Sequence, residues 1–107
     1  MFSSIIKNVS AEEAHKLIND NKEVIILDVR TKEEYDVGHI RGAKLVPVQV
    51  LSMKLSELMQ YKSRPVLVYC ASGGRSPRAV KTLASNDFTN LYHLTKGLSS
   101  WKYSLSR

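Results

Sequence analysis

The feature that most limits the fold is a set of short, nearly unbroken apolar runs separated by segments with helical spacing. Residues 24–29 (VIILDV), 65–70 (PVLVYC) and 90–94 (NLYHL) are the clearest of these runs. A strand that helices cover on both faces is apolar along its whole length, whereas a strand with one solvent-exposed face alternates polar and apolar residues. Residues 44–46 form a briefer run that ends at Pro47, which is typical of a strand end. The runs therefore predict strands of a parallel sheet.

Helical patterns lie between these runs. Ser10 and Thr31 each stand three residues before a glutamate, and each such pair forms a capping box. The two boxes predict one helix over residues 11–20 and a second, shorter helix that Gly38 ends. Apolar side chains at helical spacing predict a third helix within residues 50–60.

A fourth helix is expected directly after the strand at 65–70. Ser76 followed by Pro77 reads as an N-cap with proline at the first helical position. Trp101 and Tyr103 belong to a last amphipathic segment, which we expect to pack back on the sheet. This alternation predicts an α/β fold with an open, mostly parallel sheet, helices on both faces and right-handed crossovers.

The bulk properties narrow the function. The chain has 107 residues, which suits one domain over 1–107. One cysteine cannot form an internal disulfide, and we find neither a signal peptide nor an apolar stretch of membrane-spanning length, so we expect a cytoplasmic protein with no membrane partner. The net charge of +6 favours anionic partners, but the lysines are scattered and no basic stripe suggests nucleic acid. We expect a monomer, with a weak dimer as the alternative.

Cys70, the single cysteine, is the candidate nucleophile. It ends an apolar run and is followed by ASGGRSP, so a strand delivers the thiol into a glycine loop just before a helix. Active sites of open α/β sheets lie at such strand ends. Gly73 and Gly74 allow the backbone N–H groups to converge on the sulfur, and the positive end of the helix adds to them. This setting favours the thiolate. A lone cysteine is more often a packing residue, but packing requires no glycine pair, arginine and helix start directly after it.

The rest of the loop suits an anion held on or near the sulfur. Arg75 offers a planar fork of donors that keeps its charge, and two serines offer hydroxyl groups. The predicted substrate-binding residues are Ala71, Ser72, Gly73, Gly74, Arg75 and Ser76. Among the histidines, His15, His39 and His93, none is an obvious partner base, and each is interpreted as structural or solvent-facing. One cysteine and three dispersed histidines match no metal-ligand spacing, so neither a metal nor another cofactor is expected.

Three stretches of the chain resemble the signatures of the rhodanese family of sulfurtransferases. They are Leu27-Asp28-Val29-Arg30 with Glu33-Glu34-Tyr35 and residues 38–43 (GHIRGA), then residues 70–76 (CASGGRS), and finally residues 94–101 (LTKGLSSW). The resemblance runs from about residue 7 to residue 103 and implies a single-domain rhodanese with a five-stranded sheet. It implies a thiosulfate sulfurtransferase-type enzyme in which the Cys70 thiolate takes sulfur from thiosulfate or a similar anionic donor. The resulting persulfide would pass its sulfur to cyanide, a thiol or a protein.

The first signature also supplies supporting residues. Asp28 is expected to pair with Arg30 or to brace the loop, with a strand-end cap as the alternative role. Arg41 is expected at the rim of the site. The chain departs from the family in two places, because Lys96 stands where a first glycine is frequent and Ala71 stands where an arginine or lysine is frequent. The substrate preference therefore stays open.

Two other classes of function fit parts of the pattern. Cysteine phosphatases and arsenate reductases of related fold place one more residue between cysteine and arginine, which makes room for a tetrahedral oxyanion. Four residues lie between Cys70 and Arg75, which favours a smaller sulfur cargo. A non-catalytic interaction module usually lacks the cysteine, and a module that carries persulfide for one protein partner would use the same chemistry.

Overall fold

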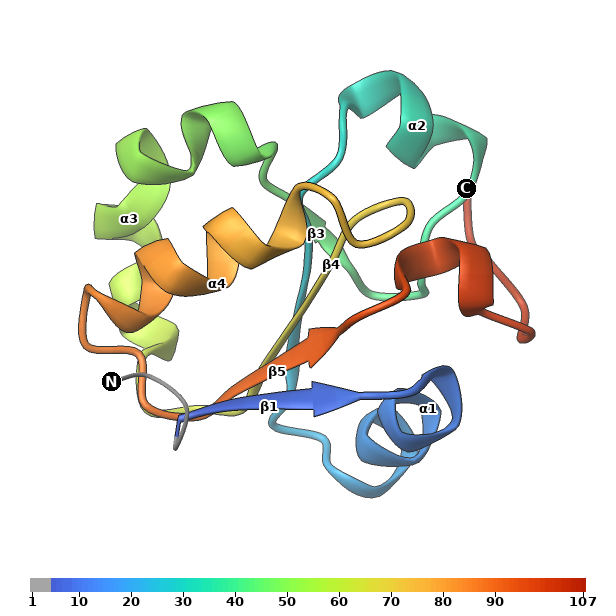
Figure 1. The fold of residues 1–107 in the computed structure, drawn as a ribbon, viewed down its shortest axis with the longest axis horizontal. Coiled ribbons are helices and arrows are strands. Elements are labelled where there is room, and N and C mark those ends of the chain that lie inside the picture. The colour runs from blue at the N-terminus through green and yellow to red at the C-terminus, as the bar shows by residue number, and fades with distance from the viewer. Residues whose placement is uncertain (1–4) are drawn as a thin grey trace.

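The computed structural model describes residues 5–107, and Figure 1 shows the fold. The strands in this range are β1 (Ile6–Val9), β2 (Ile25–Asp28), β3 (Lys44–Leu45), β4 (Val66–Tyr69) and β5 (Leu91–Leu94). The α-helices are α1 (Ala11–Asp20), α2 (Lys32–Val37), α3 (Leu51–Leu58) and α4 (Ser76–Ala84). Short 3₁₀ helices are η1 (Val48–Val50), η2 (Met59–Tyr61) and η3 (Gly97–Ser100).

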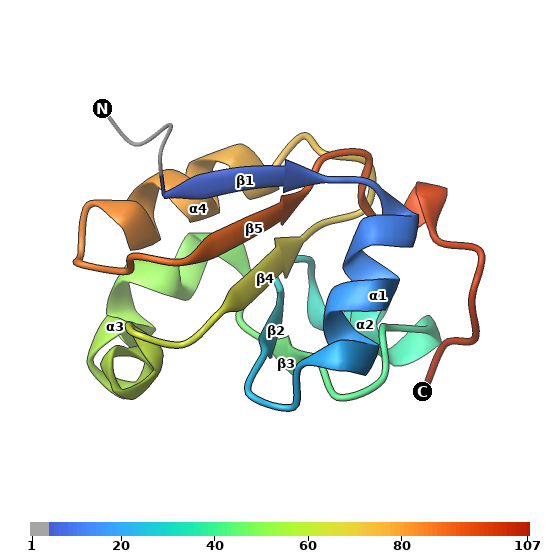
Figure 2. The same cartoon turned by 90° about the horizontal axis from the view of Figure 1, so that it is seen from below.

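The strands form one open sheet in the order β1-β5-β4-β2-β3, and each neighbouring pair is parallel. Figure 2 shows this order, with α1 on one face of the sheet and α3 and α4 on the other. The predicted α/β fold, a five-stranded open parallel sheet with helices on both faces, is confirmed.

The central strands explain the apolar runs. All four residues of β2 and all four of β4 are buried, as expected where helices cover both faces. Val66 and Val68 of β4 pack toward α3 and α4, while Leu67 and Tyr69 pack toward α1 and the segment before β3. The core therefore consists of two apolar layers, one on each side of the sheet.

The edge strand β1 is a strand that the apolar runs do not predict. Its residues pair in register with β5, with Ile6 opposite Leu91 and Val9 opposite Leu94. The two middle residues of β1, Lys7 and Asn8, are exposed. An edge strand carries such polar residues readily, which hides it from a search for apolar runs.

The helix starts largely follow the sequence signals. Both capping boxes are present, with Glu13 N–H donating to Ser10 Oγ at 3.1 Å and Glu34 N–H donating to Thr31 Oγ1 at 3.2 Å. The start of α4 is a correction, because Ser76 is its first helical residue and not its N-cap. The hydroxyl of Ser76 therefore does not cap the helix and points into buried surroundings.

A buried polar network ties β2 and β4 to the segment before β3. The carboxylate of Asp28 accepts from Arg30 Nη2 and from the Tyr69 hydroxyl, both at 2.7 Å. The Tyr69 oxygen accepts from Ile40 N–H at 3.0 Å, and Arg30 Nη2 also donates to the carbonyl of Gly38 at 2.7 Å. Burial, followed by the negative charge of Asp28, raises the pKa of Tyr69. The network fixes the ends of the two central strands beside the candidate site.

The last segment was predicted to pack on the sheet through Trp101, Tyr103 and Leu105, and it does so only in part, because Leu105 is 46% exposed. The ring of Tyr103 stacks on His15 of α1 with a centroid distance of 3.7 Å, and Trp101 packs against the apolar layer on that side. Further along, His39 and Ser106 form an antiparallel bridge. Within residues 5–107, no helix is long and apolar enough to cross a membrane.

Candidate active site

Cys70 directly follows β4 at the carboxyl edge of the sheet, and residues 71–75 form the loop that leads into α4 (Figure 1). β4 lies in the middle of the sheet, between β5 and β2. The structure therefore delivers the thiol to the strand end that the sequence predicts.

The sulfur of Cys70 is surrounded by donors from its own loop. Gly73 N–H donates to Sγ at 3.2 Å, and Ser76 N–H donates at 3.4 Å. The hydroxyl oxygen of Ser76 lies 3.3 Å from Sγ, where it accepts from the thiol and can donate to the thiolate. Cys70 is only 1% exposed, so these donors act in a protected setting.

Two opposing influences set the pKa of the Cys70 thiol. Burial, the larger single influence, favours the neutral thiol and raises the pKa. The Ser76 hydroxyl and the N–H groups of Arg75, Ser76 and Gly73 stabilise the thiolate, and together they outweigh burial. The pKa of Cys70 therefore lies below its ordinary value, as expected for a reactive thiol.

The middle of the third sequence signature, residues 97–99, fixes the loop from outside. Leu98 N–H donates to the carbonyl of Cys70 and Ser99 N–H to that of Ala71, both at 2.9 Å. This contact requires Gly97, whose φ is +64° and whose Cα would carry a Cβ only 2.6 Å from the carbonyl oxygen of Cys70. η3 therefore positions Cys70 and Ala71, where β4 passes into the loop.

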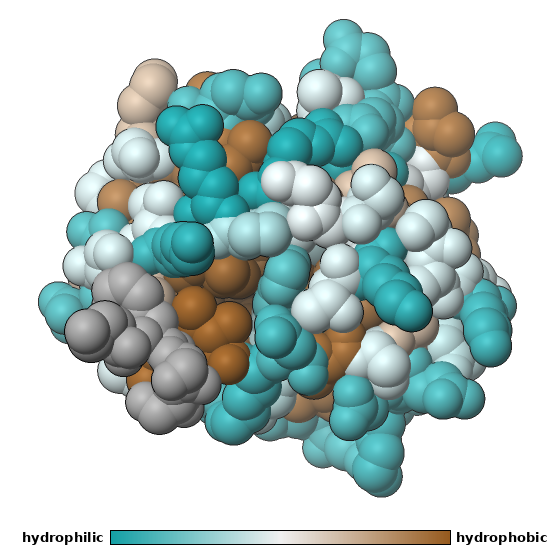
Figure 3. All heavy atoms as spheres, viewed as in Figure 1, coloured by the Kyte–Doolittle hydropathy of each residue, from teal (hydrophilic) through white to brown (hydrophobic). Residues whose placement is uncertain are grey.

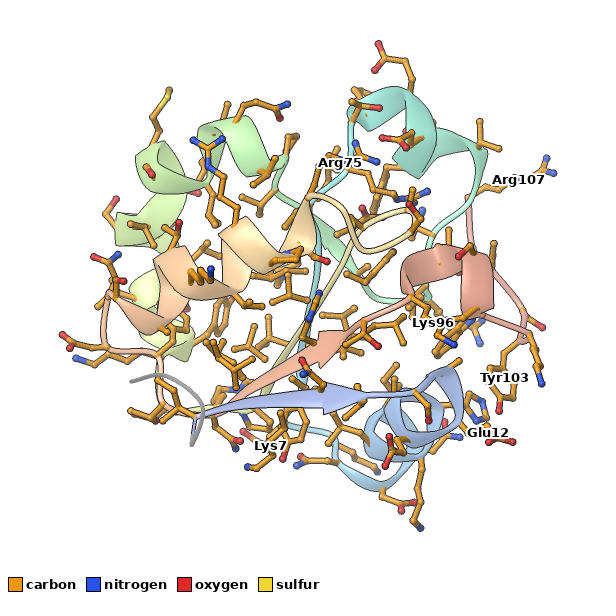
Figure 4. The ribbon with its side chains drawn as sticks, in the orientation of Figure 1. Lys7, Glu12, Arg75, Lys96, Tyr103 and Arg107 are labelled. Carbon is orange, nitrogen blue, oxygen red and sulfur yellow. The ribbon has the colours of Figure 1, made fainter. Side chains whose placement is uncertain are left out.

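Arg75 differs from the expected arrangement. Its guanidinium forms a two-pronged ion pair with Glu34 of α2, with N–O distances of 2.8 and 2.9 Å. Figure 4 shows the Arg75 side chain at the start of α4 on the side of α2. This ion pair and the hydrogen bonds from Thr31 lower the pKa of Glu34 to about 2, against the opposing effect of burial. The guanidinium of Arg75 is engaged in this ion pair and acts on Cys70 through its charge.

His93 of β5 is a site residue that the sequence interpretation missed. Its Nε2 lies 2.6 Å from Ser76 Oγ, so Cys70, Ser76 and His93 form one chain of contacts. His93 is 6% exposed, and burial lowers its pKa, so the ring is neutral near neutral pH. A histidine one residue before the end of a strand was the available signal.

The structure brings some of the remaining predicted residues to the loop and leaves others away from it. Ser72 and Gly74 lie in the loop and are exposed. Asp28 pairs with Arg30, the first of the two roles expected for it, and the pair braces β2 and β4. Arg41 is exposed and lines a hollow beside α1 and the segment after η3, and no residue of the Cys70 loop lines that hollow.

The part of the chain that the structure describes contains no group of three or more histidine, cysteine, aspartate or glutamate side chains placed to hold a metal ion. The groups that the structure places around the sulfur are backbone amides, a hydroxyl and, beyond the hydroxyl, an imidazole.

Comparison with known proteins agrees with this geometry. The model of the rhodanese-like domain family matches residues 10–104, which is most of the chain. The chain belongs to the rhodanese-like family. A member of the same fold family, a rhodanese-like domain protein from Staphylococcus aureus, superposes with a TM-score of 0.80 at 29% identity, over 94% of this chain and 96% of that one.

Several bacterial proteins are similar to the chain in sequence. The chain is 32% identical over 101 residues to a protein of Coxiella burnetii named thiosulfate sulfurtransferase GlpE, covering 90% of this chain and 87% of that protein. It is 38% identical over 76 residues to YqhL of Bacillus subtilis, covering 71% of this chain. The chain spans 59% of YqhL and a smaller share of some other relatives, so those proteins are longer.

Proposed function

We propose that this protein is a sulfurtransferase that moves a sulfane sulfur from thiosulfate or a similar anionic donor to a thiophilic acceptor through a persulfide on Cys70. The observation that carries the proposal is the convergence of two backbone N–H groups and one hydroxyl on the sulfur, at 3.2 to 3.4 Å. Membership of the rhodanese-like family and a sulfurtransferase-named relative support the same reaction class.

The first step forms the persulfide. The Cys70 thiolate attacks the outer sulfur of the donor, the sulfur–sulfur bond of the donor breaks, and sulfite leaves with that electron pair. The terminal sulfur on Cys70 then carries the negative charge. Fixed amide dipoles stabilise this anion and the charge that develops on the way to it, because they need no reorganisation in a protected site.

The second step returns the enzyme to its starting state. A nucleophilic acceptor such as cyanide, a thiol or a protein thiolate attacks the outer sulfur, and the persulfide bond breaks with its electron pair on Cys70. Cyanide becomes thiocyanate and the Cys70 thiolate is regenerated. A covalent intermediate between two separate half-reactions gives ping-pong kinetics.

Charge and access both bear on the choice of donor. The positive charge of Arg75 lies within electrostatic range of Cys70, although Glu34 offsets part of it. The net charge of +6 steers anions toward the protein. On the face that Figure 3 shows, hydrophilic side chains are spread over the elements in view and do not gather in one stripe. Since Cys70 is 1% exposed, we expect compact donors to react faster than bulky ones.

Intact mass spectrometry tests the proposal. After incubation with thiosulfate, the wild-type protein should gain the mass of one sulfur atom, and cyanide should remove it with release of thiocyanate. The Cys70→Ser variant should gain no mass while keeping the same circular dichroism spectrum. An unchanged wild-type mass with thiosulfate and with a polysulfide or persulfide donor would refute the persulfide. Hydrolysis of an aryl phosphate without any sulfur transfer would instead assign the site to the phosphatase class.

A further inference from the structure

The least expected feature of the site is a line of three side chains from three different elements. Cys70 follows β4, Ser76 begins α4, and His93 lies in β5. Ser76 Oγ is 3.3 Å from Cys70 Sγ and 2.6 Å from His93 Nε2. Ser76 is fully buried, and the other two residues are 1% and 6% exposed, so water does not readily replace either contact.

The fold holds His93 firmly in this place. Within the sheet it is paired in register with Asn8 of β1 and with Val68 of β4, two residues before the cysteine. Side chains two residues apart on a strand share one face of the sheet, so Val68, Cys70 and the neighbouring His93 all face α4. Strand pairing and not a flexible loop therefore sets the position of the imidazole.

We propose that His93 is a positioning residue that directs the Ser76 hydroxyl and thereby sets the fraction of Cys70 present as thiolate. The inference rests on the proposed function, because a larger thiolate fraction matters only if Cys70 is the nucleophile. The contacts among Cys70, Ser76 and His93 do not depend on which sulfur donor the protein uses. His93 touches neither the sulfur nor a substrate, and it acts only through Ser76.

The hydroxyl of Ser76 has one proton and can donate to one neighbour at a time. With Cys70 as a thiol, the S–H donates to Ser76 Oγ and the Ser76 O–H donates to Nε2 of His93. With Cys70 as a thiolate, the Ser76 O–H donates to the sulfur and Nε2–H donates to Ser76 Oγ. The second arrangement stabilises the anion, because the serine oxygen receives a hydrogen bond while its own proton is committed to sulfur.

Proton transfer along the three side chains converts the first arrangement into the second. The thiol proton passes to the Ser76 oxygen as the Ser76 proton passes to Nε2, and the Nδ1 proton of the ring is then lost to solvent. The site thus loses one proton in all, and His93 changes tautomer while ending neutral. Burial lowers the pKa of His93, which favours this neutral end state over a lasting imidazolium.

Other charged groups also influence the Cys70 sulfur, and their influence has to be distinguished from that of His93. Arg75 interacts electrostatically with Cys70 and is itself paired with Glu34. Asn8 and Val68, the strand neighbours of His93, do not titrate. The charged or titratable groups around the site are Arg75 in the loop, Arg78 and Lys81 on α4, Asp28 and Arg30 at the end of β2, Glu34 on α2, Lys7 on β1 and Lys96 after β5.

The test is the pH dependence of Cys70 alkylation by iodoacetamide, followed by intact mass on the free protein without any sulfur donor. Only the thiolate reacts, so the midpoint of the rate profile reports its formation. We expect His93→Leu and Ser76→Ala each to raise the midpoint and to lower the rate at neutral pH by about three- to tenfold, which is half to one pKa unit. Alkylation of the double variant should be no slower than that of the slower single variant, because both substitutions remove the same hydrogen bond between Ser76 and His93.

Two further variants separate positioning from general packing. His93→Gln keeps a hydrogen-bonding amide near the position of Nε2, so its midpoint should lie closer to wild type than that of His93→Leu. His39→Gln is the matched control, since His39 is also buried, at 7% exposure, and hydrogen-bonds to the Tyr35 carbonyl and not to Ser76. The control should leave the midpoint unchanged. An unchanged midpoint in a folded His93→Leu protein, or additive effects in the double variant, would overturn the proposal.

A measurement on the wild-type protein decides the matter even where a variant does not fold. The nitrogen chemical shifts of the His93 ring should report a change of tautomer at the same pH as the alkylation midpoint, and ring shifts that stay constant through that midpoint would overturn the proposal. If these titrations behave as expected but thiosulfate adds no sulfur to Cys70, the proposed function fails and the role of His93 in thiolate formation stands.

Discussion

Gly73 is the position where a single added carbon should do most damage to the site. Its φ is +99°, a conformation that side chains rarely adopt, and a Cβ there would lie 2.1 Å from the carbonyl oxygen of Thr95. Gly73 also supplies the N–H that donates to Cys70 Sγ at 3.2 Å. The change Gly73→Ala therefore affects the backbone, the packing against the end of β5 and the sulfur at once.

The cost can be estimated from these two features. A left-handed conformation costs a residue with a Cβ about 1–2 kcal/mol. The carbonyl of Thr95 and the loop must also move apart by roughly 1 Å, and forced backbone shifts of this kind cost about 1–3 kcal/mol. Together, Gly73→Ala should lower the free energy of unfolding by about 2–5 kcal/mol, a large share of the about 5–15 kcal/mol typical of a domain.

Two other glycines provide matched controls. Gly42 has a φ of +84° but nothing within 4 Å of an added Cβ, so Gly42→Ala should cost only the conformational part, about 1–2 kcal/mol. Gly74, the neighbour of Gly73 in the loop, has neither a positive φ nor a close atom, so Gly74→Ala should be neutral or stabilising by up to about 1 kcal/mol.

Urea unfolding of the four proteins, followed by circular dichroism, gives the three differences directly. The expected order of stability is Gly74→Ala, then Gly42→Ala, then Gly73→Ala, with slower iodoacetamide alkylation of Cys70 in the last because one amide donor moves away. A Gly73→Ala protein as stable as Gly42→Ala would refute the close approach of the loop to Thr95.

Two more predictions concern the contacts that support the site. Because Arg75 lowers the pKa of Glu34 from 4.5 to about 2, the pair contributes stability above the ordinary carboxyl pKa and loses it as the pH falls toward 2. Unfolding curves of Glu34→Gln should therefore show a smaller loss of stability over this acidic range than wild type, and equal losses would contradict the ion pair. Tyr69→Phe removes the donor to Asp28 and the acceptor for Ile40 N–H, and leaving these buried groups unpaired should lower the free energy of unfolding by about 1–3 kcal/mol. A Tyr69→Phe protein with wild-type stability in urea would show that the network is dispensable.

Much of the fold could be predicted because its signals are local. The apolar runs of β2 and β4 and the capping boxes at Ser10 and Thr31 each lie within a few residues, and the structure confirms all of them. The apolar runs did not predict β1, because an edge strand does not require an unbroken series of apolar residues. The start of α4 was placed one residue late because Ser76 satisfies the usual preference for a cap while using its hydroxyl elsewhere.

In the candidate site, too, the local contacts could be predicted from the sequence and the long-range contacts could not. The approach of Gly73 and Ser76 to Cys70 follows from a spacing of a few residues, and the sequence predicts it. The contact of Arg75 with Glu34 joins residues 41 apart, and that of Ser76 with His93 joins residues 17 apart. Both depend on which strands are neighbours and in what register, and a pattern along one sequence does not contain that information.

The three sequence signatures meet at one loop, and their contacts explain how the loop could hold a second sulfur. Leu98 and Ser99 bind the carbonyls of Cys70 and Ala71. In a trans peptide the N–H points opposite to the carbonyl, so this contact turns the N–H groups of Ala71 and Ser72 away from η3. Within residues 5–107 neither of these two N–H groups donates to a backbone carbonyl outside regular helices and strands. Gly73 and Ser76 already donate to Sγ, so the amides of Ala71 and Ser72 are among the loop donors left for the outer sulfur of the proposed persulfide.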